Sequence, residues 1–298
     1  MHIRLFEKNI IGKKLQNSLN NITQRSQNSM KIAFDISPLQ YSGTGVARYT
    51  RELILNLLRL DQSNSYTLVF NSFGNKIDSD FLLTIKQFSN LTIKQFSFPE
   101  KLLHFLWNNL HIFPLEWFIG RHDVFYYSDW YTPPFSGKKI TTVHDLVFKK
   151  YPETVDPYIL KTQEERFNFL EKNNVTIIAD SNSTKKDIIE HYPNLSEEIT
   201  VVYPGVMTAR QTEEFCKQVL QKFNIAKPYV LSVGKNEPRK NMQNLVKAFA
   251  SLNSTTHELV IVGPQGWGNQ VTSIGRVSDP ELFALYQKAK AFVMPSLY

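Results

Sequence analysis

Apolar and polar residues are distributed along the chain in short blocks that predict strands followed by amphipathic helices. The run Lys31–Ile36 predicts a first strand. The segment after it places apolar residues three or four positions apart, as one buried face of a helix does, at Val46, Tyr49, Leu53, Leu57 and Leu60. The same order of strand, turn and helix recurs at 140–172, 175–192 and 229–252. Repeated units of this kind predict the α/β class with parallel sheets.

The stretch 229–252, YVLSVGKNEPRKNMQNLVKAFASL, adds a concentration of positive charge to this pattern. A β-rich run ends at Gly234, and the predicted helix then places four apolar residues on one face that we expect to be buried, namely Met242, Leu245, Phe249 and Leu252. Lys235, Arg239 and Lys240 lie between strand and helix. Unpaired N–H groups at a helix start favour anions, and three cations beside them suit a diphosphate. A solvated basic loop is the alternative interpretation.

A second candidate loop follows the first predicted strand. Gly43 and Gly45 flank Thr44 at the start of an amphipathic helix. Glycines allow the backbone to approach a ligand closely, and the helix start offers N–H donors. A dinucleotide-binding fingerprint would need a third glycine where the chain has Arg48, so this loop matches that fingerprint only in part.

His144 and Asp145 come directly after the predicted strand 140–143. Ligands of open α/β sheets bind outside the carboxyl ends of the strands. A lone histidine is more often structural than catalytic, but this position makes His144 a candidate for a ligand-facing residue.

Three segments resemble family 4 glycosyltransferases, which are retaining enzymes with the GT-B fold. The sequence G-K-N-E-P-R-K-N at 234–241 is similar to their donor-phosphate loop, and T-V-H-D-L-V-F-x-x-Y-P-E at 142–153 closely resembles the family's own sequence. The segment G-R-V-S-D-P-E-L at 275–282 resembles the one whose backbone meets the nucleotide base, around Arg276 and Val277.

The resemblance implies an α/β protein of the GT-B type, with two Rossmann-like domains facing a cleft. It implies that Lys240 holds the diphosphate of a nucleotide-sugar, with Gly234, Lys235 and Arg239 beside it. Lys235 stands where the family often has arginine, and lysine lacks the forked donor geometry of arginine.

By the same resemblance, His144 faces the donor sugar and the reaction centre, and Asp145 braces the loop. The Gly43–Gly45 loop touches the donor phosphates or the acceptor, and Ser181 or Ser183 faces the cleft. The family needs no metal, so we expect no cofactor beyond the nucleotide-diphosphate sugar, which is itself a substrate.

We expect four regions: a polar, basic extension at 1–29, an acceptor-side domain at 30–206, a connection at 207–228 and a nucleotide-sugar-binding domain at 229–298. In the family, the sequence that ends here with P-S-L-Y continues into a loop with two glutamates. We therefore expect the second domain to be incomplete and the chain to be truncated at its C-terminus.

The expected function is transfer of a sugar, mannose or a similar hexose, with retention, from a nucleotide-diphosphate donor to a glycan or lipid-linked acceptor in the synthesis of a surface polysaccharide such as lipopolysaccharide. The alternative is a non-catalytic remnant that binds acceptor or partner without turnover. A dinucleotide-dependent oxidoreductase is a third reading, weakened by the missing glycine.

The amino-acid composition limits the class of protein, its cellular location and its partners. The chain has 298 residues with 42% hydrophobic and 20% charged residues, which is globular composition. Cys216 is the only cysteine, and there is no signal peptide or long apolar run, so we expect a cytoplasmic protein. A net charge of +7 favours phosphorylated substrates or peripheral contact with an anionic membrane. The basic residues are scattered and form no nucleic-acid motif, so no nucleic-acid partner is expected.

Some local expectations concern individual elements. Asp156 and Pro157 are typical of a helix start, with the helix continuing to about Lys172. Thr184 and Asp187 could form a capping box. The heptapeptide LTIKQFS occurs twice, at 83–89 and 91–97, which we interpret as a local duplication in a peripheral strand or helix. The many aromatic residues at 100–135 are expected mostly in the core, with an acceptor groove or lipid contact as alternatives.

Overall fold

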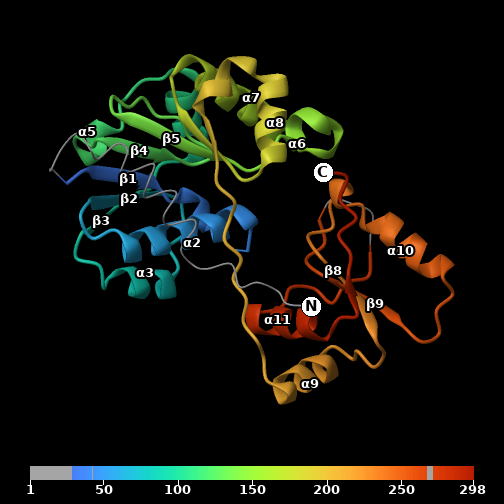
Figure 1. Ribbon diagram of the computed structural model, residues 1–298. Coiled ribbons are helices and arrows are strands. Elements are labelled where there is room, and N and C mark those ends of the chain that lie inside the picture. Colours follow the sequence, from blue (N-terminus) through green and yellow to red (C-terminus); the bar gives the residue numbers. More distant parts are fainter. Residues whose placement is uncertain (1–28, 42, 267–270) are drawn as a thin grey trace. The chain divides into compact units, whose positions relative to one another are not determined.

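The computed structural model describes residues 29–41, 43–266 and 271–298. The expected extension at 1–29 lies outside the described residues except for its last position. The chain divides into two compact units (Figure 1). The first contains the described residues up to Lys150 together with Asp156–Gly205, and the second contains Tyr151–Val155 and Val206–Tyr298.

The first unit is built on a seven-stranded parallel sheet with the order β3-β2-β1-β4-β5-β6-β7. The strands are β1 (Lys31–Asp35), β2 (Ser65–Asn71), β3 (Leu91–Phe96), β4 (Val124–Tyr127), β5 (Lys138–Val143), β6 (Thr176–Ala179) and β7 (Ile199–Val201). The order runs outward in both directions from β1 and β4. In such sheets, ligands bind at the carboxyl ends of the strands near the point where the order reverses.

Helices cover both faces of this sheet. In Figure 1, α2 and α3 lie on one face and α7 and α8 on the other. The helical elements are η1 (Ser37–Gln40), α2 (Gly45–Leu60), α3 (Ser79–Ile85), α4 (Glu100–Leu103), the π-helical η2 (His104–Asn109), α5 (Glu116–Ile119), α6 (Val147–Lys150), α7 (Pro157–Lys172), α8 (Asn182–His191) and η4 (Pro193–Glu198). Helix α2 packs on β1 and β2 through Ile54, Leu57 and Leu58. The predicted buried face is confirmed only in part: Leu57 is buried and Val46, Tyr49 and Leu53 are half-buried, but Leu60 is 48% exposed because it lies at the end of the helix.

The second unit has a three-stranded parallel sheet with the order β10-β8-β9. Its elements are η3 (Pro152–Thr154), α9 (Glu213–Lys222), β8 (Tyr229–Val233), η5 (Pro238–Lys240), α10 (Met242–Ser251), β9 (Glu258–Val262), α11 (Asp279–Lys288) and β10 (Ala291–Phe292). Cys216 and Val219 of α9 pack with Leu285 of α11 in the core of this unit. The structure therefore places α9, which lies in the expected connection 207–228, inside the second unit.

The buried face expected for α10 was wrong in part. Met242 is 1% exposed, but Leu245 and Phe249 are half-buried and Leu252 is 70% exposed. The described part of the second unit offers only a three-stranded sheet, and α10 is buried only at the end nearest β8. Periodicity shows which side of a helix is apolar, but not how much of that side another element covers.

The start of α8 also differs from the expectation. Ser181 is its N-cap, and the Ser181 hydroxyl accepts a hydrogen bond from the Thr184 N–H at 3.0 Å. Thr184 is thus the third residue inside the helix and cannot be the cap, while Asp187 pairs with Lys150 at 3.0 Å. By contrast, α7 begins with the Asp156 cap and ends at Lys172, as predicted.

Candidate functional site

The carboxyl end of β5 carries His144 and Asp145. The Asp145 carboxylate accepts a hydrogen bond from the Val147 N–H at 3.2 Å, so Asp145 turns the chain into α6, as expected of a residue that braces the loop. The His144 side chain is 24% exposed. It is therefore held by the protein but remains accessible to a ligand.

Three neighbours fix His144. Its Nδ1 lies 2.6 Å from Oδ2 of Asp180, the residue directly after β6. The ring of Tyr49, from α2, meets the imidazole edge-on, with centroids 4.8 Å apart. The Thr184 hydroxyl donates to the His144 carbonyl at 3.1 Å. Together these contacts fix both the backbone and the ring of His144.

Tyr49 is itself held in place. Its hydroxyl lies 3.2 Å from that of Thr142, which also accepts a hydrogen bond from Tyr126 at 2.5 Å. Burial raises the pKa of Tyr49, with a smaller contribution from the negative charge of Asp180. The phenol is therefore protonated at neutral pH, and its ring is a rigid wall beside His144.

The Gly43–Gly45 loop lies at the start of the helix that carries Tyr49, one turn before it. Thr44 is the N-cap of α2, and its hydroxyl accepts from the Ala47 N–H at 3.2 Å. Gly43 has φ of 83°, which suits glycine. A Cβ added to Gly45 would meet nothing within 4 Å. Since packing does not require glycine at position 45, the space there is available to a ligand.

In the second unit, the expected phosphate loop is the turn from Gly234 to Asn241. Glu237, 8% exposed, lies at its centre. Its two carboxylate oxygens lie 3.3 Å from the Lys235 ammonium and 3.1 Å from Nε of Arg239. A carboxylate between two cations reduces their repulsion, so Glu237 allows this turn to gather positive charge.

Two glycines bring the end of β9 against this loop. A Cβ on Gly263 would lie 2.1 Å from the Gly234 carbonyl oxygen, and one on Gly266 would lie 2.5 Å from the Asn236 carbonyl oxygen. The two segments are also hydrogen-bonded, from the Gly234 N–H to Val262 at 2.8 Å. Only residues without a side chain fit this contact, so the shape of the loop depends on β9.

Lys240 ends the 3-10 turn η5, which lies between β8 and α10 as expected for the predicted loop. Asn241 follows with φ of 56°, in the left-handed conformation that asparagine tolerates, and α10 then begins. The Asn241 side-chain amide donates to the Pro295 carbonyl at 3.2 Å, and the Leu297 N–H donates to the Arg239 carbonyl at 2.9 Å. Residues 295–297 therefore hold the turn that presents Arg239 and Lys240.

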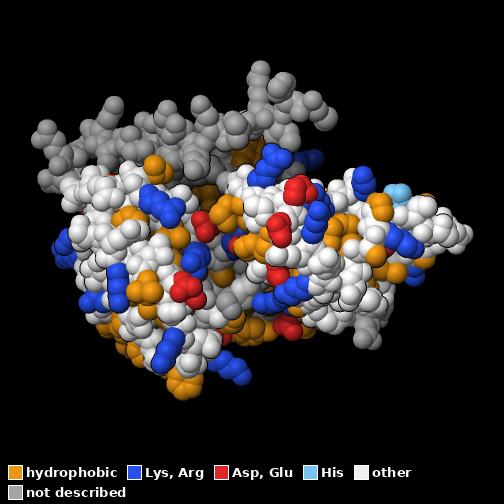
Figure 2. Space-filling model, turned by 90° about the horizontal axis from the view of Figure 1, so that it is seen from below, with side chains coloured by type: hydrophobic (Ala, Val, Ile, Leu, Met, Phe, Trp, Pro, Cys, Tyr) orange, Lys and Arg blue, Asp and Glu red, His pale blue; other side chains and the backbone are white. Residues whose placement is uncertain are grey.

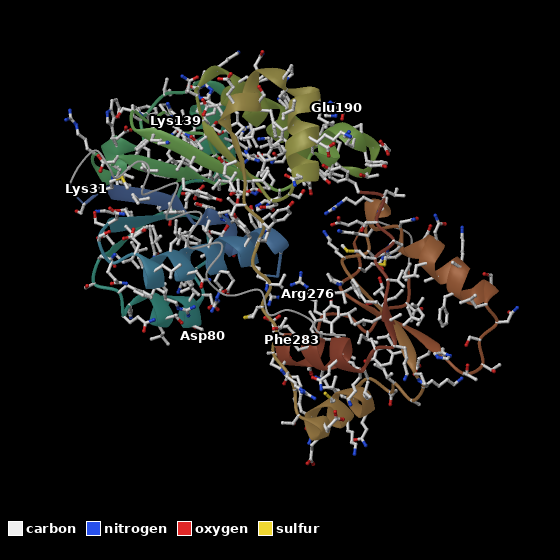
Figure 3. All side chains as sticks on the ribbon, in the orientation of Figure 1. Lys31, Asp80, Lys139, Glu190, Arg276 and Phe283 are labelled. Carbon is white, nitrogen blue, oxygen red and sulfur yellow. The ribbon has the colours of Figure 1, made fainter. Side chains whose placement is uncertain are left out.

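Arg276 and Val277 follow Gly275, which connects them to the end of β9 and so to this loop. Gly275 pairs with Gly263, and the N–H of Gly263 donates to the Gly275 carbonyl at 2.9 Å. Arg276 is exposed at the margin of the second unit (Figure 3). The Val277 side chain is half-buried and packs into the core, so only its backbone is suited to meet a ligand.

The structure thus gathers the predicted residues into two groups, one in each unit. In the first unit, Tyr49 connects His144 with the Gly43–Gly45 loop. In the second unit, one turn carries Gly234, Lys235, Arg239 and Lys240. Arg276 is linked to that turn through Gly275 and Gly263. The expectation that His144 and Lys240 face one another across a cleft concerns both units and stays a prediction.

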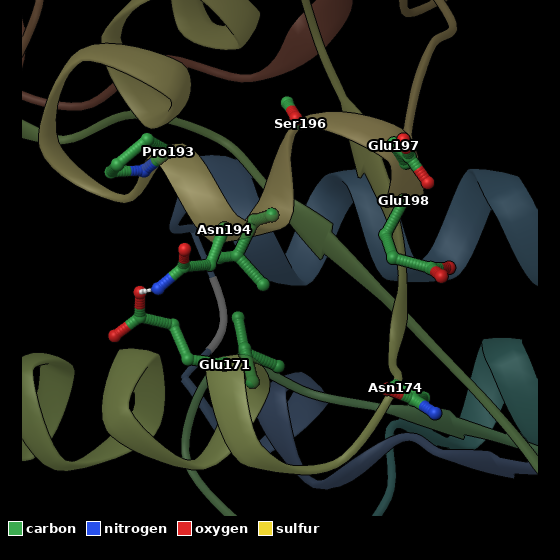
Figure 4. A pocket seen from close by; sticks show the side chains of 9 residues that line it. Glu171, Asn174, Pro193, Asn194, Ser196, Glu197 and Glu198 are labelled. Atoms are coloured by element: carbon green, nitrogen blue, oxygen red, sulfur yellow. Dashed lines mark hydrogen bonds between the residues drawn. The ribbon is translucent and has the colours of Figure 1, made fainter.

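A hollow of about 330 Å³ lies elsewhere, between the end of α7 and η4 (Figure 4). Its lining includes Glu171, Glu197 and Glu198, and Asn194 donates to Glu171 at 3.4 Å. These segments precede β6 and β7, so the hollow is at the amino ends of the strands, away from the edge that carries His144. Within the described ranges, no three or more His, Cys, Asp or Glu side chains are placed so that they could hold a metal ion together.

Sequence reasoning missed five residues of these groups: Tyr49, Asp180, Glu237, Gly263 and Gly266. Asp180 follows a strand just as His144 does, and paired neighbouring strands would have indicated their proximity. Tyr49 was assigned only to a helix face. The glycines after β9 carry no signal of their own, because their close contacts come from a strand pairing that is not local in sequence.

Comparison with known proteins adds independent findings. Residues 217–298 match the family model described as Glycosyl transferases group 1. The chain is 26% identical over 300 residues to O-antigen chain mannosyltransferase B of Escherichia coli, covering 90% of this chain and 77% of that protein. It is 29% identical over 184 residues to O-antigen chain mannosyltransferase RfbU of Salmonella typhimurium, covering 56% of this chain and 48% of that protein.

Solved structures share the fold. Sucrose-phosphate synthase from Thermosynechococcus elongatus has a TM-score of 0.61 at 15% identity, covering 90% of this chain and 76% of that one. HepE from Anabaena, in complex with UDP and glucose, has a TM-score of 0.56 at 16% identity, covering 90% of this chain and 74% of that one. At these identities the likeness concerns the fold alone.

Proposed function

We propose that the chain is a glycosyltransferase that transfers a hexose from a nucleotide-diphosphate donor to a glycan or lipid-linked acceptor. The match of residues 217–298 to the Glycosyl transferases group 1 model and the α/β GT-B fold support this. The observation that carries this proposal is the turn after β8, where Lys235 and Arg239 pair with the buried carboxylate of Glu237 and Lys240 ends the same turn.

The donor diphosphate binds at this turn. Lys240 and its two cationic neighbours neutralise the charge that develops on the leaving diphosphate, which is the main electrostatic demand of the reaction. We propose that the protein side chains supply this charge and that no metal or other cofactor is required. Full activity in excess EDTA supports this part of the proposal, and activity that returns only with added Mg²⁺ or Mn²⁺ overturns it.

His144 contacts the donor sugar. Its position at the carboxyl end of β5, its partial exposure and its rigid surroundings support this role. The Gly43–Gly45 loop leaves open space at a helix start on the same edge, where backbone N–H groups can contact the donor phosphates or an acceptor hydroxyl.

The transferred sugar is mannose or a similar hexose, and the anomeric configuration is retained. Two relatives named as O-antigen chain mannosyltransferases support the choice of sugar and a place in the synthesis of a surface polysaccharide. Retention rests on the motif resemblance. The anomeric proton signal of the product in NMR tests it: an α-linked product from an α-linked donor is expected, and a β-linked product contradicts it.

The acceptor side meets an anionic membrane peripherally, at the cytoplasmic face. Apolar side chains are exposed along one segment of the first unit: Leu102, Phe105, Leu110, Ile112, Phe113 and Trp117. Trp117 is 72% exposed, and Lys101 and Arg121 flank the segment. Exposed aromatic residues beside cations suit a lipid headgroup region.

Basic side chains over the face seen in Figure 2 are scattered rather than joined in one stripe, and a scattered arrangement of this kind does not suit nucleic acid.

No helix in the described part of the chain is long and apolar enough to span a bilayer. Membrane contact is therefore tested with vesicles. Sedimentation with phosphatidylglycerol vesicles is expected for the wild type and is weakened in Trp117→Ser. Equal sedimentation of both proteins, or none with either, contradicts this contact.

Transfer itself is tested by release of nucleoside diphosphate and by glycosylation of a lipid-linked glycan, with GDP-mannose and UDP-glucose as donors. Lys240→Ala and His144→Gln are expected to abolish transfer, whereas Lys247→Ala, on an exposed position of α10, keeps it. Loss in Lys247→Ala as well would refute the assigned roles. Nucleotide binding without turnover in the wild type would instead favour the alternative of a non-catalytic binding protein.

A further inference from the structure

Asp180 has no evident structural task. It directly follows β6, which pairs in parallel with β5 so that Ala179 lies opposite Val143. The next residue along each strand is therefore Asp180 on one and His144 on the other. The cap of α8 is Ser181 and not Asp180, so the helix does not require a carboxylate at position 180.

The contacts of Asp180 are directed at His144. Its Oδ2 lies 2.6 Å from His144 Nδ1, while Oδ1 is buried and makes no hydrogen bond within the part of the chain that the structure describes. A desolvated carboxylate oxygen without a donor is costly to stability. A carboxylate kept at such a cost, with an imidazole as its partner, is typical of a residue that orients a functional histidine.

We infer that Asp180 is a positioning residue for the transfer reaction, acting through His144; this inference rests on the proposed function. The Asp180 carboxylate holds the His144 proton on Nδ1. The other ring nitrogen, Nε2, is then an acceptor for a hydroxyl group of the bound sugar. Without the carboxylate, the imidazole is free to carry its proton on Nε2, and the same atom becomes a donor that can no longer accept a hydrogen bond from the sugar hydroxyl.

The surroundings of the ring make this effect specific. Tyr49 limits ring rotation from one side, and Thr184 fixes the His144 backbone. A change at position 180 therefore alters which nitrogen carries the proton more than it alters where the ring lies. This separates a positioning role from a role in packing.

The test uses Asp180→Ala and Asp180→Asn in the full chain, with ¹⁵N-histidine NMR to report the proton position on His144. The His144 signals are assigned by their absence from His144→Gln. The wild type is expected to show protonated Nδ1 and acceptor-type Nε2. Asp180→Ala shifts the ring toward protonated Nε2, with kcat for transfer lowered roughly 10- to 100-fold, as for loss of the hydrogen-bond partner that orients a metal-bound histidine.

Asp180→Asn is the conservative variant. Its side-chain amide has the shape of the carboxylate but offers Nδ1 an NH2 donor, which favours the proton on Nε2. We therefore expect the same proton shift and loss of kcat as in Asp180→Ala, in a protein that keeps its fold, so this variant controls for folding. Asp187→Asn is the matched control, because Asp187 is a buried carboxylate nearby that pairs with Lys150 at 3.0 Å instead of with a histidine. The His144 signals of this control stay unchanged.

Identical His144 signals in the wild type and Asp180→Ala overturn the inference, whatever the activity. A wild type that shows no transfer with any donor, while Asp180→Ala still moves the proton, leaves the positioning contact standing and defeats the proposed function instead. An equal loss of kcat in Asp180→Ala and Asp187→Asn assigns Asp180 to folding and also overturns the inference.

Discussion

The two groups of site residues occupy the same place in their sheets, beyond the carboxyl ends of parallel strands, yet they are built in different ways. In the second unit, three cations share one turn, and a buried glutamate and close glycine contacts support them. In the first unit, one histidine is fixed by hydrogen bonds and an aromatic contact, and the glycine loop beside it is open. Gathering like charges needs rigid support from the protein, whereas orienting one imidazole ring needs only a few well-placed neighbours.

The glycines of the two groups also differ, because Gly263 is packed against backbone whereas Gly45 faces open space. The largest effect on stability is therefore expected from a substitution at Gly263. Gly263→Ala should lower the free energy of unfolding of the second unit by about 3 kcal/mol, because a Cβ would overlap the Gly234 carbonyl and φ of 140° is unsuited to alanine. Chemical denaturation measures this loss. A variant as stable as the wild type would show that the β9 contact does not shape the phosphate loop.

Glu237→Gln should have a smaller effect on the same unit. Losing the carboxylate leaves Lys235 and Arg239 to repel one another and should cost roughly 1–3 kcal/mol of stability. Added pyrophosphate should recover part of the melting temperature, since an anion can take the place of the lost charge. Glu214→Gln, on an exposed position of α9, is the control and should behave as the wild type. Failure of pyrophosphate to recover any stability would argue against an anion site here.

Acid should weaken the second unit through Glu281. Its hydrogen bond with Lys222, and those with Ser278 that complete the cap of α11, lower its pKa to about 2 from the usual 4.5. A carboxyl group with a lowered pKa stabilises the fold above pH 4.5, and this contribution is lost as pH falls toward 2. The unfolding free energy of Glu281→Gln should therefore depend less on pH across this window. Parallel curves for both proteins would contradict the assignment.

The smallest effect on stability is expected for Gly45→Ala in the first unit. A Cβ there meets open space, so stability should change by less than about 0.5 kcal/mol. Transfer activity should nevertheless fall, because the methyl group occupies space proposed for the ligand. Unchanged activity would separate this loop from the site, and a large loss of stability would show that the loop is packed after all.

Local sequence signals predicted some elements closely. Asp156 and Pro157 start α7 because a side-chain cap and a proline are both favourable in the first turn. The heptapeptide LTIKQFS shows where local signals end: its first copy finishes α3 and the second forms β3. The first follows the Asp78 cap, and the second pairs with β2. Identical residues thus take two structures because their neighbours differ.

The sequence also predicted part of the site, but not all of it. The motif residues around Gly234 and His144 were found because short segments carry them. Asp180 and Gly263 could not be found this way, since their roles arise from strand pairing between segments about 30 residues apart. Glu237 lay inside the quoted motif, but its burial between two cations depends on how the turn folds.

The most direct test of the account compares nucleoside diphosphates with the corresponding monophosphates, for both guanosine and uridine, by isothermal titration calorimetry. For at least one base, the diphosphate should bind at least about tenfold more tightly, equivalent to about 1.4 kcal/mol from charge-assisted contacts with the second phosphate. Lys240→Ala should remove this preference, and Lys247→Ala should keep it. Equal affinity for diphosphate and monophosphate in the wild type, or an undiminished preference in Lys240→Ala, would contradict the claim that the turn after β8 holds a diphosphate.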